Sequence, residues 1–189
     1  MGTENPEKQF LDYRLRKIAL ACGFTHINEL KPETLKPRLE VRDACSEDKC
    51  KSYNKSWSCP PACGSLEDCE KKLALYSQGL LLQTTGKLED SLDYESMERI
   101  GKDHNKNVNL FSFSLTEFRK QGNNILVLGS GPCTRCNPCK YPDAPCCCGE
   151  SMIISMEAFG LVVSDVCKAN NMAYYHGPNT ISFTGCVLF

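Results

Sequence analysis

The sequence predicts an α/β or α+β fold in which a central mixed sheet is flanked by helices and carries cysteine-rich metal-binding loops. Three observations predict it. Helical and strand patterns alternate from about residue 24 onward, and two short strands are wholly apolar, as buried strands are. Eleven of the 14 cysteines gather in two groups, at 45–69 and 133–148. We expect a single domain over residues 1–189, because no internal repeat or low-complexity linker divides the chain.

The first half of the chain predicts two helices and three strands. Apolar residues at helical spacing indicate a helix over 10–22, which Gly23 ends. Residues 24–30 and 38–41 are typical of short strands. The run from Ser65 to Asp68 resembles a capping box, which predicts a helix beginning at Leu66. Residues 80–82 form the first wholly apolar strand.

The second half begins with a charged segment, 87–107, that is helical in part, and with a helical stripe from 108 to 118. The second apolar strand, 125–128, leads directly into the downstream cysteine group. A further helix is expected from Ser155 to about Asn171, with Glu157 capping it; a proton-donating Glu157 is the alternative. Residues 172–175 and 180–188 predict a final hairpin.

Composition narrows the class of protein. The net charge is −1 and the isoelectric point about 6.3, so nothing indicates a nucleic-acid partner. No apolar run approaches the ~20 residues of a membrane span, and the first residues lack the apolar core of a signal peptide. We therefore expect a cytoplasmic protein without a membrane partner. Because the cytosol keeps thiols reduced, 14 cysteines indicate metal binding or redox chemistry rather than a disulfide scaffold.

Cysteine spacing distinguishes the candidate metals. Cys133-x2-Cys136-x2-Cys139 has the spacing of bacterial ferredoxins, in which a fourth thiolate comes from elsewhere in the chain. Structural zinc sites usually show paired C-x2-C units or histidines, and no histidine lies near either group. The spacing therefore favours a [4Fe–4S] cluster over zinc downstream, and a second cluster is expected upstream. The candidate ligands are Cys45, Cys50, Cys59, Cys63, Cys69, Cys133, Cys136, Cys139, Cys146, Cys147 and Cys148.

A specific order of motifs runs through nearly the whole chain. It consists of Cys45…Cys50…Tyr53…Trp57-Ser58-Cys59-Pro60-Pro61…Cys69, then Cys133-x2-Cys136-x2-Cys139…Pro145-Cys146, then Ser155-Met156-Glu157-Ala158. This order resembles a bacterial and archaeal family of predicted metal-binding proteins, domain of unknown function 2284. The resemblance implies one ligand set of Cys133, Cys136, Cys139 and Cys146. It suggests a second set of Cys45, Cys50, Cys59 and Cys69.

The chain departs from the family pattern at both groups. Cys147 stands where the pattern has an arginine, Cys148 follows it, and Cys63 is added upstream. These thiols leave two choices open: Cys63 or Cys69 upstream, and one of residues 146–148 downstream. They also permit ligand exchange, or one larger bridged iron–sulfur cluster if the two groups meet in space.

The expected function is electron transfer through two [4Fe–4S] clusters to or from a redox protein partner. No dinucleotide fingerprint, P-loop or flavin signature accompanies the cysteines, which suits a carrier. One alternative is an iron–sulfur enzyme that acts reductively on a small substrate. The other is a structural zinc protein that functions through protein–protein contact, with metal binding contributing to folding.

Overall fold

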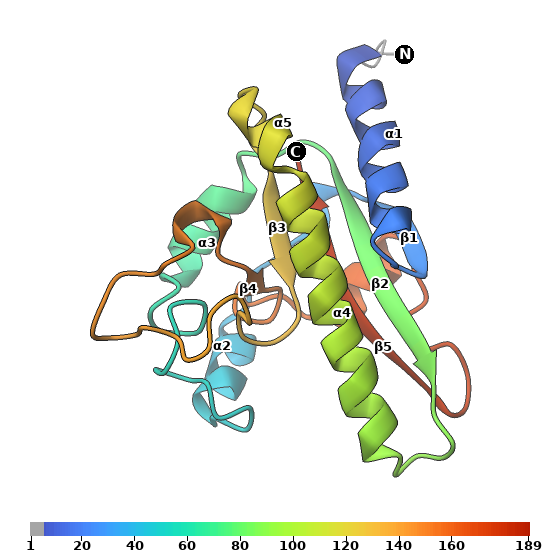
Figure 1. Cartoon of the computed structure of the whole chain (residues 1–189), viewed down its shortest axis with the longest axis vertical. Coiled ribbons are helices and arrows are strands. Elements are labelled where there is room, and N and C mark those ends of the chain that lie inside the picture. The colour runs from blue at the N-terminus through green and yellow to red at the C-terminus, as the bar shows by residue number, and fades with distance from the viewer. Residues whose placement is uncertain (1–5) are drawn as a thin grey trace.

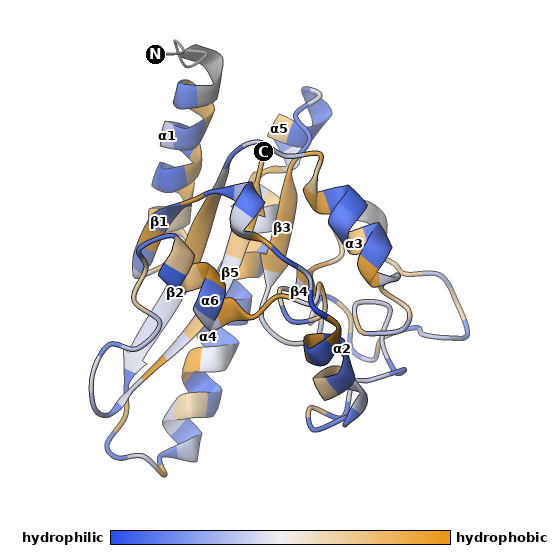
Figure 2. Ribbon diagram, turned by 180° about the vertical axis from the view of Figure 1, so that it is seen from behind, coloured by the Kyte–Doolittle hydropathy of each residue, from blue (hydrophilic) through white to orange (hydrophobic). Residues whose placement is uncertain are grey.

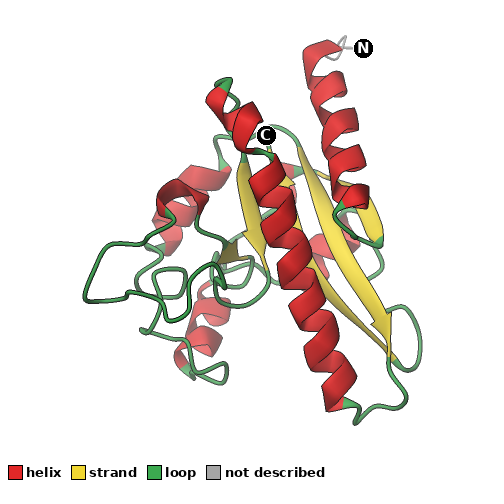
Figure 3. Ribbon diagram, viewed as in Figure 1, coloured by secondary structure: helices red, strands yellow, loops and turns green. Residues whose placement is uncertain are grey.

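A computed structural model describes residues 6–189, and residues 1–5, where the sequence predicts no signal peptide, lie outside the described part. A five-stranded mixed sheet of order β1-β2-β5-β3-β4 forms the centre (Figures 1 and 3). Neighbouring strands in this sheet are antiparallel, except for the parallel pair β3–β4. The strands are β1 (His26–Leu30), β2 (Gly79–Lys87), β3 (Leu126–Gly129), β4 (Ile154–Ser155) and β5 (Thr180–Leu188). The predicted mixed sheet with flanking helices is confirmed.

Helices cover both faces of the sheet. Helices α1, α4 and α5 pack on one face (Figure 1), and α3, α6 and the turn after β4 pack on the other. The α-helices are α1 (Pro6–Ala21), α2 (Leu39–Ser46), α3 (Leu66–Leu73), α4 (Tyr94–Ser114), α5 (Thr116–Lys120) and α6 (Val163–Ala169), and short 3-10 turns are η1 (Pro32–Thr34) and η2 (Gly149–Ser151). None of the helices in the described part is both long and apolar enough to cross a membrane.

Strand β2 shows why the run at 80–82 is wholly apolar. Side chains alternate between faces along a strand, so Leu80 and Leu82 pack against α1 and α4 while Leu81 packs in the opposite core. Strand β5 divides in the same way, with Val187 in one core and Cys186 in the other. Figure 2 shows β3 and the first part of β2 coloured as hydrophobic, whereas the rest of β2 is pale. This part of the sheet is thus buried on both faces.

Several local predictions are confirmed. Helix α1 ends at Ala21, and Gly23 follows with a φ of 97°, a conformation that suits glycine. The Ser65 side chain accepts a hydrogen bond from the backbone N–H of Asp68. The Asp68 carboxylate in turn accepts one from the backbone N–H of Ser65, and this pair of bonds forms the capping box of α3.

Three expected elements are wrong. Residues 38–41 begin helix α2 rather than a strand, since a four-residue pattern does not separate the two. The helix expected from Ser155 begins only at Val163, because β4 ends at Ser155 and Gly160, with a φ of 79°, interrupts helical backbone. The final hairpin does not form: β5 pairs with β2 and β3 on its two sides, so no edge remains for residues 172–175.

Candidate metal centre

The two cysteine-rich loops lie side by side beyond the β3–β4 edge of the sheet (Figures 1 and 2). Trp57 of the upstream loop donates a hydrogen bond from its indole Nε1 to the carbonyl of Ala144, at 2.9 Å. The Trp57 ring also meets the ring of Tyr141 edge-on, with centroids 4.9 Å apart. The Tyr141 hydroxyl donates to the side-chain oxygen of Asn54 at 2.6 Å. The two loops, which are far apart in sequence, are therefore in contact with each other.

A buried serine pair joins the loops at the cysteines themselves. The Ser58 hydroxyl accepts a hydrogen bond from the backbone N–H of Cys133 at 2.9 Å, and lies 3.0 Å from the Ser56 hydroxyl. The same hydroxyl lies 3.9 Å from the Cys59 sulfur. Both serines are buried, so their hydrogen bonds are shielded from water.

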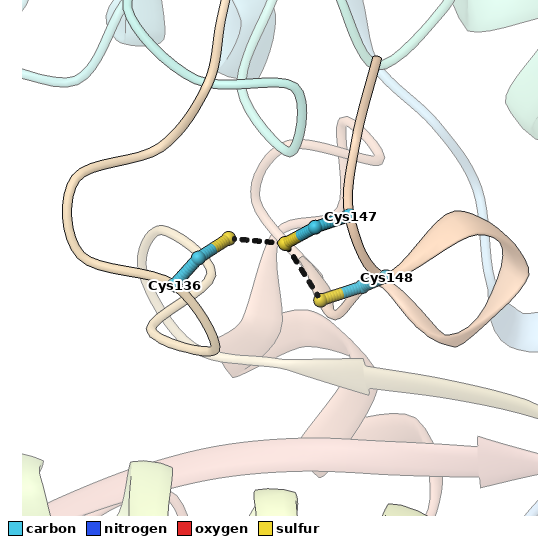
Figure 4. Close-up of side chains that lie close together, drawn as sticks. All are labelled: Cys136, Cys147 and Cys148. Carbon is cyan, nitrogen blue, oxygen red and sulfur yellow. Dashed lines mark hydrogen bonds between the residues drawn. The ribbon is translucent and has the colours of Figure 1, made fainter. Parts of the chain in front are cut away.

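Three downstream sulfurs form a tight cluster (Figure 4). The Sγ atom of Cys147 lies 3.0 Å from that of Cys136 and 3.7 Å from that of Cys148. All three sulfurs lie within 4.8 Å of one another, and they are the one such group among the described residues. Thiolates that share a tetrahedral metal, with bonds of about 2.3 Å, lie about 3.8 Å apart. The trio of Cys136, Cys147 and Cys148 is thus a candidate metal-binding cluster.

The three thiols of this trio differ in pKa. The hydrogen bond to Cys147 raises the pKa of Cys136 to about 11, and burial raises the pKa of Cys148 to about 12. Hydrogen bonds from both thiols lower the pKa of Cys147. Cys147 is therefore the first of the three thiols to lose its proton, and a metal cation would favour deprotonation of all three.

Two of the remaining downstream cysteines affect the trio electrostatically. Cys133 acts to raise the pKa values of Cys136 and Cys148, and Cys139 acts to raise the pKa of Cys147. Burial tends to raise the pKa of Cys139, but hydrogen bonds from the backbone of the two loops outweigh it and lower that pKa. Cys146, which the resemblance implies as a ligand, is not one of the three clustered sulfurs.

Three of the five upstream cysteines line a cavity of about 220 Å³, hereafter the upstream cavity. Because a water molecule occupies about 30 Å³ in the liquid, this space accommodates a group of several atoms. Burial raises the pKa of Cys45 and Cys59, and negative charge on Cys50 raises both further. Its lining consists of Cys45, Cys50, Tyr53, Cys59, Pro60, Gly131, Pro132, Ser155, Glu157 and Ala158. Both cysteine loops and the turn after β4 therefore contribute walls.

Cys63 and Cys69 are not in the lining of the upstream cavity. The Cys63 sulfur faces the carbonyl oxygen of Ala158 at 3.8 Å, and burial raises its pKa to about 11. Cys69 is buried in the core on α3 and accepts a hydrogen bond from the Arg42 guanidinium at 3.3 Å. Burial raises the pKa of Cys69, whereas the Arg42 charge acts to lower the pKa values of Cys45, Cys63 and Cys69.

Two charged side chains, Arg42 and Glu157, take positions that the sequence did not predict. Arg42 follows residues 38–41, which the sequence predicted as a strand, but it projects from α2 to the carbonyl of Gly64 and to Cys69. Glu157, expected to cap a helix or to donate a proton, lies in the turn after β4 and lines the upstream cavity. Burial raises the pKa of Glu157. The Ser155-Met156-Glu157-Ala158 motif indicated Glu157. Only the tertiary packing of the loops brings Arg42 to the cysteines, so no local pattern could have found it.

Comparison with known proteins agrees with this geometry. Neither the curated proteins nor the solved structures contain a match to the chain. A family model described as "Predicted metal-binding protein (DUF2284)" matches residues 28–189, a span that includes both cysteine groups, the turn after β4 and all five strands except the first two residues of β1. The chain therefore belongs to this family of predicted metal-binding proteins.

Proposed function

We propose that the protein carries two [4Fe–4S] clusters, one in each cysteine group, and transfers electrons to or from a redox protein partner. The observation that carries the proposal is the upstream cavity. A cubic cluster needs thiolates that approach from different sides of a space large enough for several atoms. Cys45, Cys50 and Cys59 line such a space, of about 220 Å³.

The donor set suits this group. Cys45, Cys50 and Cys59 would hold the upstream cluster, and Cys133, Cys136 and Cys139, with Cys147 or Cys148, the downstream one. Thiolates are the ligands that iron–sulfur clusters use, and a bound cluster supplies one-electron oxidation and reduction. The Trp57–Tyr141 pair and the buried serines exclude water from the region between the groups.

Each site has one thiol at the surface. Cys50 of the upstream group and Cys147 of the downstream group are exposed, whereas Cys59 is buried. A partner protein would therefore exchange electrons at one of these two thiols. The contact between the loops keeps the path between the two groups short.

A second candidate function is supported by the trio of Cys136, Cys147 and Cys148. Sulfur distances of 3.0 and 3.7 Å are closer to those around one tetrahedral ion than to the corners of a cube. A zinc ion bound there would fasten the downstream loop and contribute to folding. The protein would then act through contact with other proteins.

Anaerobic analysis of iron, acid-labile sulfide and zinc, with EPR spectra before and after dithionite, tests the proposal. Two cubic clusters require about eight irons with matching sulfide and a signal that appears on reduction. About four irons with one zinc would assign a cluster to the upstream cavity and zinc to the trio. Zinc without sulfide would replace electron transfer with the structural function.

A further inference from the structure

We propose that Glu157 provides the fourth ligand of the upstream site, which would then bind its cluster through the thiolates of Cys45, Cys50 and Cys59 and one carboxylate. This inference rests on the proposed iron–sulfur function. It assigns to the upstream group a ligand of different chemistry from the thiolates that the cysteine pattern indicates.

The first support is position. Glu157 lines the upstream cavity together with the three cysteines. The turn that carries it is tightly fixed: the Gly160 N–H donates to the Glu157 carbonyl at 2.8 Å, and the Ala158 N–H donates to the Ser155 hydroxyl at 3.0 Å. A side chain on such a turn is held toward the cavity at little further entropic cost.

The second support is an unsatisfied atom. The Oε2 atom of Glu157 is enclosed and has no hydrogen-bond partner within the described residues. The carboxyl group bonds to its own backbone and to the Ser155 side chain, but a buried carboxylate oxygen without a partner is costly, and a metal cation would compensate it. Arg42 does not fill this role in this structure: its Nη2 donates to Gly64 and Cys69, and its Nε atom, also enclosed, has no partner among the described residues.

The third support concerns the competing thiols. Cys63 and Cys69 are the two other upstream cysteines, and neither is part of the cavity lining. The Cys63 sulfur already faces the carbonyl of Ala158, and Cys69 is packed among core residues of α3. The carboxylate is thus the donor that the fold presents to the cavity beside the three thiolates.

A carboxylate at one corner has a measurable consequence. Oxygen is a harder donor than sulfur and binds iron less firmly in a cluster of thiolates. The iron at Glu157 should therefore leave first on mild oxidation and leave a three-iron cluster, which has its own EPR signature. A thiolate at position 157 should prevent this loss.

The test uses the full-length chain with Cys136→Ala and Cys147→Ala, which leaves the upstream site as the remaining cluster site. Into this background are placed Glu157→Gln, Glu157→Cys and, separately, Cys63→Ser and Cys69→Ser. Glu70→Gln is the matched control, because it makes the same change at an exposed carboxylate on α3. Iron and sulfide content and EPR spectra are recorded before and after ferricyanide.

We expect the background protein and the control to convert to the three-iron form on oxidation. Glu157→Gln should already contain about three irons per cluster as purified, and Glu157→Cys should keep four after oxidation. Cys63→Ser and Cys69→Ser should behave as the background does. The inference is overturned if either serine variant loses the cluster, or if both Glu157 variants match the background. Absence of sulfide from the wild-type protein would instead refute the proposed function itself.

Discussion

The Ser58 hydroxyl accepts a hydrogen bond from the backbone N–H of Cys133, 2.9 Å long, and thereby joins the upstream cysteine group to the first cysteine of the downstream group. Ser58 is 1% exposed. This hydrogen bond couples the two cysteine groups, so a substitution in one group should change the stability and metal binding of the other.

Ser58→Ala should weaken both groups. The substitution leaves the Cys133 N–H and the buried Ser56 hydroxyl without this partner, so we expect the free energy of unfolding to fall by about 1–2 kcal/mol. Release of metal to a chelator should become faster. Denaturant unfolding and chelation kinetics measure both effects. Ser114→Ala is the control, at an exposed serine that bonds to the Leu110 carbonyl and to Cys22, outside both cysteine groups. Unchanged chelation kinetics would show that the loops hold metal independently.

Cys136→Ala and Cys186→Ala should differ in metal content. Cys136 belongs to the sulfur trio, so its loss should remove the metal of the downstream group. Cys186 is fully buried in β5 and belongs neither to the lining of the upstream cavity nor to the trio, so its loss should cost stability without changing metal content. Elemental analysis of the two variants decides the matter. Equal metal in Cys136→Ala and the wild type would contradict the assignment.

The choice among the adjacent cysteines 146–148 can be tested directly. The structure places the sulfurs of Cys147 and Cys148 beside Cys136 and leaves Cys146 outside the trio. We expect one of Cys147→Ala and Cys148→Ala to lower downstream metal content if a cluster is bound, and both to do so if the trio binds a single ion. Cys146→Ala should leave the metal content unchanged. If Cys146→Ala alone removes the metal, the ligand set implied by the family pattern is the correct one.

Buried His104 should make stability depend on pH. Its Nδ1 atom lies 3.0 Å from the Thr84 hydroxyl, and burial lowers its pKa to about 4. Below about pH 6.5 the unfolded chain binds a proton that the folded protein excludes, so stability is complete above that pH and falls as the pH drops toward 4. The loss approaches about 3 kcal/mol. Urea unfolding of the wild type and His104→Leu across this range should show a shallower slope for the variant; parallel slopes would exclude His104 as the cause.

Local sequence predicted those parts of the fold that local chemistry determines. The apolar runs at 80–82 and 125–128 are strands because both of their faces are buried, and the Ser65 capping box begins α3 because its hydrogen bonds close within one turn. Residues 172–175 were wrongly predicted as a strand, because strand pairing depends on residues outside this segment. Strand β5 bonds to two partners distant in sequence, and no pattern in the last residues records that choice.

The candidate site shows the same division. Spacing and residue type predicted that the cysteines at 45–69 and 133–148 serve a metal, and the clustered sulfurs of Cys136, Cys147 and Cys148 agree with that prediction. Which sulfurs lie together depends on how the loops fold back. The positions of Arg42 and Glu157 depend on α2 and on the turn after β4, whose conformations the sequence predicted wrongly.

Strand β5 occupies the centre of the sheet although it is the last of the strands in the chain. During synthesis, β1–β2 and β3–β4 therefore emerge from the ribosome as two pairs with no common neighbour. Only the arrival of β5 joins them and fixes the cysteine loops beyond β3. Maturation with metal should accordingly follow translation of β5, and until then no bound metal protects the nascent thiols from oxidation.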